Sequence, residues 1–242
     1  MKKSEIKIIT LANHGFLNFT KNSIASLERL QTNHQMKVYC VDDLCYNDLK
    51  QNYSECELII NEHNKSNSNL SVYPRSNSNT NSGFKDIMLM KYPAISDALC
   101  NYEYVLFIDS DVIFKDDRFI EYLTDNIKDN DVLFQSETDG SVETIDPCAG
   151  LMFIQSNENT LNFFNVDTVV SDKNFIENVS DQDYVRKNKN KLKHDYMDVN
   201  LFPNGRYFQK YINEISPYMI HYNWCRPRQK IKIMRRTGGW YH

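Results

Sequence analysis

Two aspartates separated by one residue stand in the most apolar part of this chain. Asp109 and Asp111 follow the apolar run 104–108, and a second run, 112–114, comes directly after them. Buried parallel strands have this composition, and an unpaired charge inside one is costly. The two carboxylates should therefore lie at the end of a strand or hold a cation. Because Mg²⁺ and Mn²⁺ prefer carboxylate oxygens and often bridge them to substrate phosphates, we predict a metal and phosphate site here.

An ordinary solvated turn is the alternative explanation of this tripeptide. Asp-x-Asp occurs often by chance, and taken alone it is weak support for a metal site. The apolar, strand-like sequence on both sides is what distinguishes this occurrence. A solvated turn does not need such flanks, so the functional interpretation is favoured.

The N-terminal part of the chain alternates between strand and helix patterns. These patterns predict strands at residues 6–11, 38–41 and 58–60 and a helix over residues 20–30. Strand, helix, strand is the order typical of a doubly wound α/β sheet. Ligands bind outside the carboxyl ends of the strands in such sheets. We therefore expect residues 10–14, Asp42 and the two aspartates to converge.

The later part of the chain continues the alternation. It predicts helices over residues 84–99, 118–126 and 158–165, another helix opening at Asp181, and strands at residues 132–134 and 151–154. Pro93 could kink or restart its helix. From residue 217 onward the sequence is aromatic and reads as irregular. The fold class is therefore α/β, with a mostly parallel central sheet flanked by helices in one domain over residues 1–242.

Residues 61–82 interrupt this domain with an Asn/Ser-rich insertion. Such a segment has too little apolar surface to order itself. A flexible surface insertion is the favoured interpretation, and a lid that orders over bound substrate is the alternative.

Composition limits the class of protein and its partners. A chain of 242 residues with 41% hydrophobic content can bury the core of one large α/β domain. A net charge of −4 gives no broad basic surface, so we expect no nucleic-acid partner. Basic residues do gather over residues 226–236, where they form either a phosphate-binding patch or a solvated face.

Cysteine usage and the N-terminus bear on the compartment. The six cysteines are scattered without a Cys-x-x-Cys pair, which argues against a disulfide framework or a zinc site. The first residues lack a signal-peptide core, and no apolar run reaches the length of a membrane span. We expect a cytoplasmic chain without a transmembrane segment, and the oligomeric state is left open.

Four segments, in this order, resemble the nucleotide-diphospho-sugar transferase family of GT-A-fold glycosyltransferases, and more distantly the glycogenin-like enzymes. They are residues 8–13, residues 104–111, residues 147–154 with Asp181-Gln182-Asp183, and residues 221–224 followed by Lys230. The resemblance implies a Rossmann-like domain that moves a sugar from a nucleotide-sugar donor to a glycan or glycoprotein hydroxyl. A UDP-sugar is favoured and a GDP-sugar comes next.

The resemblance also implies a metal-ligand set of Asp109, Asp111 and His221, with Mn²⁺ or Mg²⁺ as the cofactor. Imidazole beside carboxylates is acceptable to Mn²⁺. Lys230 would neutralise the diphosphate leaving group. The interval between His221 and Lys230 is longer here than in the glycogenin-like pattern and contains two arginines, so the cation that contacts phosphate is left open.

Further residues match the positions at which the family binds its donor. They are Leu11, Asn13, Asp42, Lys91, Ser110, Gly150, Asn223 and Lys230. A helix N-cap explains Asp42 nearly as well, and a solvated helix lysine is the alternative for Lys91. Gly150 would let the backbone approach the sugar closely, unless it is an ordinary turn glycine.

The catalytic pair implied by the resemblance is Asp181 and Gln182, near the sugar and the acceptor. Glu137 and Asp139 are further carboxylates that could enter the site. The resemblance favours retention of the anomeric configuration, in which Asp181 stabilises or positions the reacting sugar.

Two other classes compete with this interpretation. A haloacid-dehalogenase-type phosphatase would use Asp109 as its nucleophile, but that motif normally opens its domain, whereas a strand–helix–strand pattern precedes it here. A non-catalytic nucleotide-sugar-binding module should have lost some of Asp109, Asp111 and His221, and all three are present.

Overall fold

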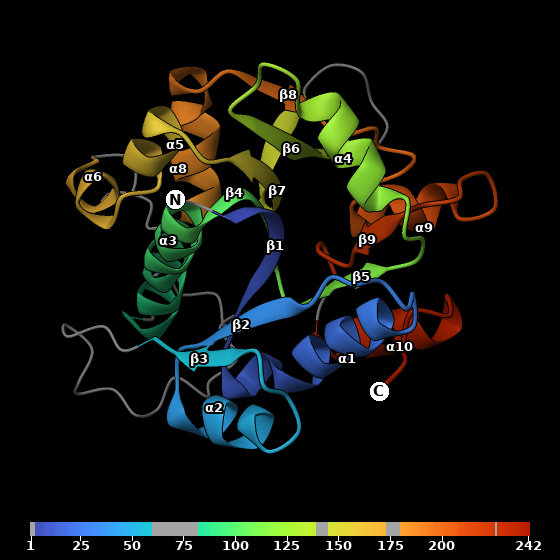
Figure 1. The fold of residues 1–242 in the computed structure, drawn as a ribbon. Helices are drawn as coiled ribbons and strands as arrows, with labels where there is room; N and C mark the ends of the chain where they lie inside the picture. The colour runs from blue at the N-terminus through green and yellow to red at the C-terminus, as the bar shows by residue number, and fades with distance from the viewer. Residues whose placement is uncertain (1–2, 60–81, 139–144, 173–179, 226) are drawn as a thin grey trace.

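The computed structural model describes residues 3–59, 82–138, 145–172, 180–225 and 227–242. A seven-stranded sheet with the order β3-β2-β1-β4-β7-β6-β8 forms the centre of this part of the chain (Figure 1). Its strands are β1 (Lys3–Ala12), β2 (Met36–Cys40), β3 (Cys56–Leu58), β4 (Tyr102–Ile108), β6 (Val132–Glu137), β7 (Asp146–Gln155) and β8 (His194–Tyr196). The insertion predicted at residues 61–82 lies almost entirely outside the described residues.

The sheet is mostly parallel, as predicted. β1 pairs in parallel with β2 and β4, β2 with β3, and β6 with β8, whereas β7 runs antiparallel to both of its neighbours. Central strands of such a sheet are buried on both faces, which explains why β4 ends in four fully buried apolar residues.

Helices cover both faces of the sheet (Figure 1). On one face lie α3 (Ser82–Asn101), α5 (Glu158–Phe163), α6 (Val166–Ser171) and α8 (Asp181–Asn188). On the other lie α1 (Leu17–Glu28), α2 (Asp43–Lys50) and α4 (Phe119–Ile127). Because successive side chains of a strand point to opposite faces, Ile8 joins one core and Ile9 the other.

The structure corrects two expectations about local structure. The C-terminal tail is not irregular: it contains the strand β9 (Met219–His221) and the helix α10 (Pro227–Arg236), which follow the helix α9 (Gly205–Tyr211). Pro93 does not divide its helix, since α3 is continuous from Ser82 to Asn101.

Strand pairing brings the candidate metal ligands together. β4 ends at Ile108, opposite Thr10 of β1, so Asp109 lies at the carboxyl end of the sheet. The short strand β5 (Val112–Phe114) follows and pairs with β9 in a separate two-stranded sheet, with Val112 opposite His221. A ligand from the C-terminal tail is thereby placed beside the two aspartates.

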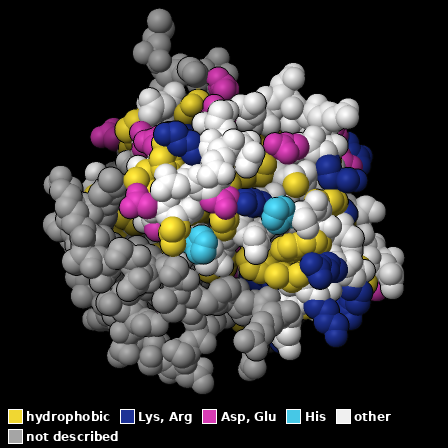
Figure 2. All heavy atoms as spheres, turned by 90° about the horizontal axis from the view of Figure 1, so that it is seen from below, with side chains coloured by type: hydrophobic (Ala, Val, Ile, Leu, Met, Phe, Trp, Pro, Cys, Tyr) yellow, Lys and Arg dark blue, Asp and Glu magenta, His cyan; other side chains and the backbone are white. Residues whose placement is uncertain are grey.

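The basic cluster of the C-terminal tail divides between two environments. Lys230 is buried, whereas Lys232, Arg235 and Arg236 of α10 are exposed. Figure 2 shows Lys and Arg side chains gathered on the side of the molecule where α10 lies in Figure 1. Within the described residues no helix has both the length and the apolar character needed to cross a bilayer. The cytoplasmic location stays a prediction.

Candidate functional site

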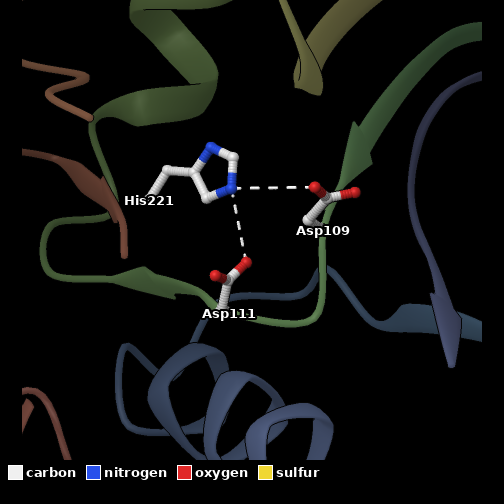
Figure 3. Close-up of side chains that lie close together, drawn as sticks. All are labelled: Asp109, Asp111 and His221. Atoms are coloured by element: carbon white, nitrogen blue, oxygen red, sulfur yellow. Dashed lines mark ion pairs between the residues drawn. The ribbon is translucent and has the colours of Figure 1, made fainter. Parts of the chain in front are cut away.

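Asp109, Asp111 and His221 form a compact group of possible metal ligands (Figure 3). One donor atom from each residue lies within 4.8 Å of the others. His221 Nε2 is 3.3 Å from Asp111 Oδ1 and 3.7 Å from Asp109 Oδ2. His221 and Asp111 are buried, whereas the Asp109 side chain is 38% exposed. An ion held here would be reached from the Asp109 side.

Gln135 orients the imidazole of His221. His221 Nδ1 lies 2.8 Å from Gln135 Oε1, and Gln135 Nε2 donates to the carbonyl of Phe202 at 3.0 Å. The bond to Phe202 fixes the orientation of the Gln135 amide, so its oxygen faces Nδ1. Because an amide oxygen can only accept a hydrogen bond, Nδ1 carries the proton. Nε2 is then left to face the aspartates with a lone pair when the ring is neutral, as metal binding requires. No motif in the sequence identified Gln135, which stands at the end of an apolar strand.

Lys230 supplies a buried positive charge to Asp111. Its ammonium forms an ion pair with Asp111 Oδ2, and both side chains are only 8% exposed. Burial raises the pKa of Asp111, but the charges of Lys230 and His221 lower it more strongly, so this pKa lies well below its ordinary value. Burial lowers the pKa of His221, yet Asp111 and Asp109 raise it above the ordinary value. Asp111 is therefore held as a carboxylate.

Lys91 is the centre of a second buried cluster. Its ammonium forms an ion pair with Asp181, lies 3.2 Å from Asp109 Oδ1, and donates to the carbonyl of Ala149 at 3.2 Å. Burial lowers the pKa of Lys91, but Asp109 and Asp181 raise it by more. Lys91 is thus a charged, fully buried residue, and the alternative of a solvated helix lysine is wrong.

Asp181 and Gln182, the predicted catalytic pair, lie at the start of α8 and line the same cleft. Gln182 donates to the carbonyl of Pro147 and accepts from the amide of Ala149 at 2.9 Å, so its side chain fixes the strand β7 next to the site. Asp181 is paired with Lys91 as described. Their catalytic roles stay predictions.

The cleft that contains these groups has a volume of about 720 Å³. All the predicted site residues except Asp42 are among those that line it: Leu11, Asn13, Lys91, Asp109, Ser110, Asp111, Gly150, Asp181, Gln182, His221, Asn223 and Lys230. A cleft of this size suits a nucleotide sugar better than a bare metal ion.

The predicted donor-binding residues at the carboxyl ends of β1 and β4 lie together. Ser110 donates to the carbonyl of Leu11 at 2.9 Å and accepts from Thr20 at 3.1 Å. Asn13 accepts from the amide of Phe16 and begins the short helix η1 (His14–Phe16). These contacts fix the loop after β1 beside the aspartates.

Asp42 acts as the N-cap of α2. It accepts from the amide of Cys45 at 2.7 Å and from that of His14 at 2.8 Å. The structural alternative stated for this residue is therefore confirmed, and a contact with the donor stays a prediction. Asp139 and Arg226 lie outside the described residues, and the side chain of Arg228 is not described either.

Gly150 leaves no room for a side chain beside the candidate metal ligands. A Cβ atom at this position would lie 2.5 Å from His221 Cε1 and still closer to Asp109 Oδ2. Both distances are far below van der Waals contact. Close packing against Asp109 and His221, two candidate ligands, therefore requires a glycine here, and an ordinary turn does not explain it.

We expect the substitution Gly150→Ala to weaken Mn²⁺ binding by at least about tenfold, because the new methyl group must displace Asp109 or His221. Calorimetric titration with Mn²⁺ measures this change. Gly238→Ala is the matched control, since a Cβ there meets no atom within 4 Å although its φ of +67° makes the substitution strained. Equal Mn²⁺ affinities for wild type and Gly150→Ala would contradict the assignment.

Comparison with known proteins identifies the family of this chain. The model of the nucleotide-diphospho-sugar transferase family matches residues 29–235. The UDP-galactose:fucoside alpha-3-galactosyltransferase of Dictyostelium discoideum is 28% identical over 290 residues. The match covers 99% of this chain but 43% of that relative, so the chain spans less than half of the relative's length.

Solved glycosyltransferase structures share the fold. The galactosyltransferase LgtC, in complex with donor and acceptor sugar analogs, superposes with a TM-score of 0.63 at 13% identity, covering 98% of this chain and 96% of that one. A glycosyltransferase involved in glycosylation of the major capsid of PBCV-1 gives a TM-score of 0.61 at 10% identity, with coverages of 96% and 98%. This likeness confirms the predicted GT-A-type α/β fold.

Proposed function

The chain belongs to the nucleotide-diphospho-sugar transferase family, and from this premise we propose that it transfers a hexose from a UDP-sugar to a sugar hydroxyl. The convergence of Asp109, Asp111 and His221 in a cleft of about 720 Å³ is the observation that carries the proposal. UDP-galactose is the donor and a fucoside the acceptor that the name of the Dictyostelium relative suggests.

The donor atoms fit a hard divalent cation. Two carboxylates and one imidazole are ligands that Mn²⁺ accepts, and their spacing within 4.8 Å allows one ion to contact all three. Asp109, Asp111 and His221 would hold it. When bound, such an ion supplies positive charge against a diphosphate as a Lewis acid.

The residues of the chain divide the remaining tasks. Lys230 lies beside Asp111 and can turn its ammonium toward a departing diphosphate, whose negative charge grows as the glycosidic bond breaks. Lys91 holds Asp181 and Asp109 close to each other in the cleft. Gln182 fixes the strand β7 beside them, and Gly150 within that strand leaves room for Asp109 and His221. Binding both substrates in this arrangement would reduce the entropy cost of the reaction.

We propose that transfer retains the anomeric configuration. The name of the relative specifies an alpha linkage, and the galactose of UDP-galactose is itself alpha-linked to the diphosphate. In such a step the bond from the anomeric carbon to the diphosphate oxygen breaks and a bond to the acceptor oxygen forms on the same face. The acceptor proton passes to the departing diphosphate. Asp181 would stabilise the positive charge that develops on the sugar.

Release of UDP from UDP-galactose in the presence of Mn²⁺ and methyl α-L-fucopyranoside tests the proposal directly. We expect turnover that requires the metal and an alpha-linked disaccharide identified by NMR. A folded protein that neither binds UDP nor releases it from UDP-galactose would contradict the proposed function. Trapping a phospho-aspartate at Asp109 would instead support the phosphatase class considered above.

Substitution of Lys230 measures its part in donor binding. We expect Lys230→Ala to weaken binding of UDP in the presence of Mn²⁺ by about ten- to a hundredfold, because one positive charge near the diphosphate is lost. Calorimetry with UDP gives the affinity. Lys232→Ala is the matched control, because that lysine lies on the same helix with its side chain exposed. An unchanged affinity for UDP in Lys230→Ala would remove Lys230 from the donor site.

A further inference from the structure

Trp224 is an exposed aromatic side chain in the cleft. It is 63% exposed, whereas the other large exposed hydrophobic residues of the described chain are aliphatic: Leu44, Ile145, Val170 and Ile212. Trp224 lines the cleft that contains the metal-ligand group. It follows His221 by three residues, at the point where the chain leaves β9.

The backbone of Trp224 adopts a conformation that bulky residues avoid. Its φ is +59°, in the left-handed region that glycine enters without cost. Keeping a residue in such a conformation costs free energy, and residues of this kind cluster at active sites and ligand-binding sites. Burial in a core does not explain this cost, because most of the Trp224 surface is exposed.

Glu137 holds the indole ring by its polar edge. The Trp224 Nε1–H donates to Glu137 Oε2, while Glu137 Oε1 accepts from Asn223 Nδ2 at 2.7 Å. Asn223 in turn accepts from the amide of Gly205 at 2.9 Å. The ring is thus oriented by a carboxylate at the end of β6, and its apolar surface is left largely to solvent.

Trp224 lies on the opposite side of the metal-ligand group from the predicted nucleotide site. Leu11 and Asn13 come from the end of β1, on one side of β4. Glu137, the partner of Trp224, ends β6, which lies on the other side of β4 beyond β7. A donor bound over the end of β1 with its diphosphate at the aspartates would leave the Trp224 side of the cleft for the second substrate.

We infer that Trp224 is the stacking platform for the pyranose ring of the acceptor. One face of a pyranose consists of C–H groups, and such a face packs well on an indole whose polar edge is already hydrogen-bonded. Arg206 and Thr138 also line the cleft and would contribute polar groups for the hydroxyls of the sugar. This inference rests on the proposed function, because it assigns the acceptor side of the same cleft.

Two substitutions at Trp224 distinguish the effect of the aromatic ring from the effect of the backbone conformation. Trp224→Gly removes the ring and suits the positive φ, whereas Trp224→Tyr keeps an aromatic face. With methyl α-L-fucopyranoside as the acceptor probe, we expect Trp224→Gly to raise the acceptor KM by about tenfold or more. The acceptor KM of Trp224→Tyr should stay much closer to that of wild type. Leu44→Ala is the matched control, an exposed apolar residue outside the cleft, and its KM should equal that of wild type.

Fluorescence provides a readout that does not depend on turnover. The chain has two tryptophans, so Trp240→Phe leaves Trp224 as the sole indole. Addition of methyl α-L-fucopyranoside in the presence of Mn²⁺ and UDP should shift the emission of this variant to the blue, because the sugar displaces water from the ring.

Calorimetry with UDP and Mn²⁺ separates failure of the inference from failure of the proposed function. Trp224→Gly should bind UDP within about twofold of wild type. If the protein binds UDP but Trp224→Gly leaves the acceptor KM unchanged, or the emission of Trp240→Phe does not respond to the sugar, the acceptor platform is wrong and the donor site stands. If wild-type protein does not bind UDP, the proposed function itself fails.

Discussion

Asp111→Asn should reduce Mn²⁺-dependent turnover of UDP-galactose by at least about a hundredfold. The substitution replaces one anionic oxygen of the metal-ligand group with an amide. It also leaves the buried ammonium of Lys230 without its counter-charge, and an unpaired buried charge destabilises the folded site. Steady-state kinetics over a range of Mn²⁺ concentrations measure the loss, which added metal should not fully reverse.

The control for Asp111→Asn is Asp116→Asn. Asp116 belongs to the segment that follows β5 and pairs with Arg118 at the surface, outside the cleft. The turnover of the Asp116→Asn variant should match that of wild type. Thermal unfolding without metal shows whether each variant is folded. A folded Asp111→Asn variant with undiminished turnover would refute the metal-ligand assignment.

Lys91→Met should lower the free energy of unfolding by about 3–5 kcal/mol, the range for breaking a buried ion pair by removing one partner. Lys91 is 3% exposed, and without it Asp181 and Asp109 are left close together with no cation between them. Methionine has nearly the same length, so the loss of charge dominates over the loss of volume. Denaturation in urea gives the free energy of unfolding.

Lys37→Met is the matched control for this prediction. Lys37 also pairs with two carboxylates, Glu57 and Asp97, but their side chains are 54% and 45% exposed. Ion pairs of this kind are worth about 0–1 kcal/mol. If Lys91→Met and Lys37→Met lowered the free energy of unfolding equally, burial of the Lys91 cluster would contribute nothing to stability.

The sheet and the aspartate pair could be predicted from the sequence because both are local patterns. Continuous apolar runs identify buried strands, and the aspartates interrupt one of those runs. The helix α10 was missed although its pattern is local too. Its sequence is mostly basic and follows an aromatic stretch, which drew attention away from the amphipathic spacing of Ile231, Ile233 and Met234 and from Pro227, a known start signal at the first position of a helix.

Contacts between distant segments could not be predicted from spacing. Lys91 and Asp181 belong to α3 and α8, which pack on the same face of the sheet, and no rule of sequence distance pairs them. The role of Gln135 could not be predicted either, because its contact with His221 depends on how β9 packs beside β6. His221 was found through the resemblance to a family, and the left-handed Trp224 was not anticipated at all.

The pairing of β5 with β9 has a consequence for biosynthesis. This pairing places His221 beside the two aspartates, and β9 is translated long after β5. A nascent chain whose N-terminal strands have already folded on the ribosome therefore presents two carboxylates without the third ligand. The proposed capture of a cation by all three residues must therefore wait until the ribosome has delivered β9.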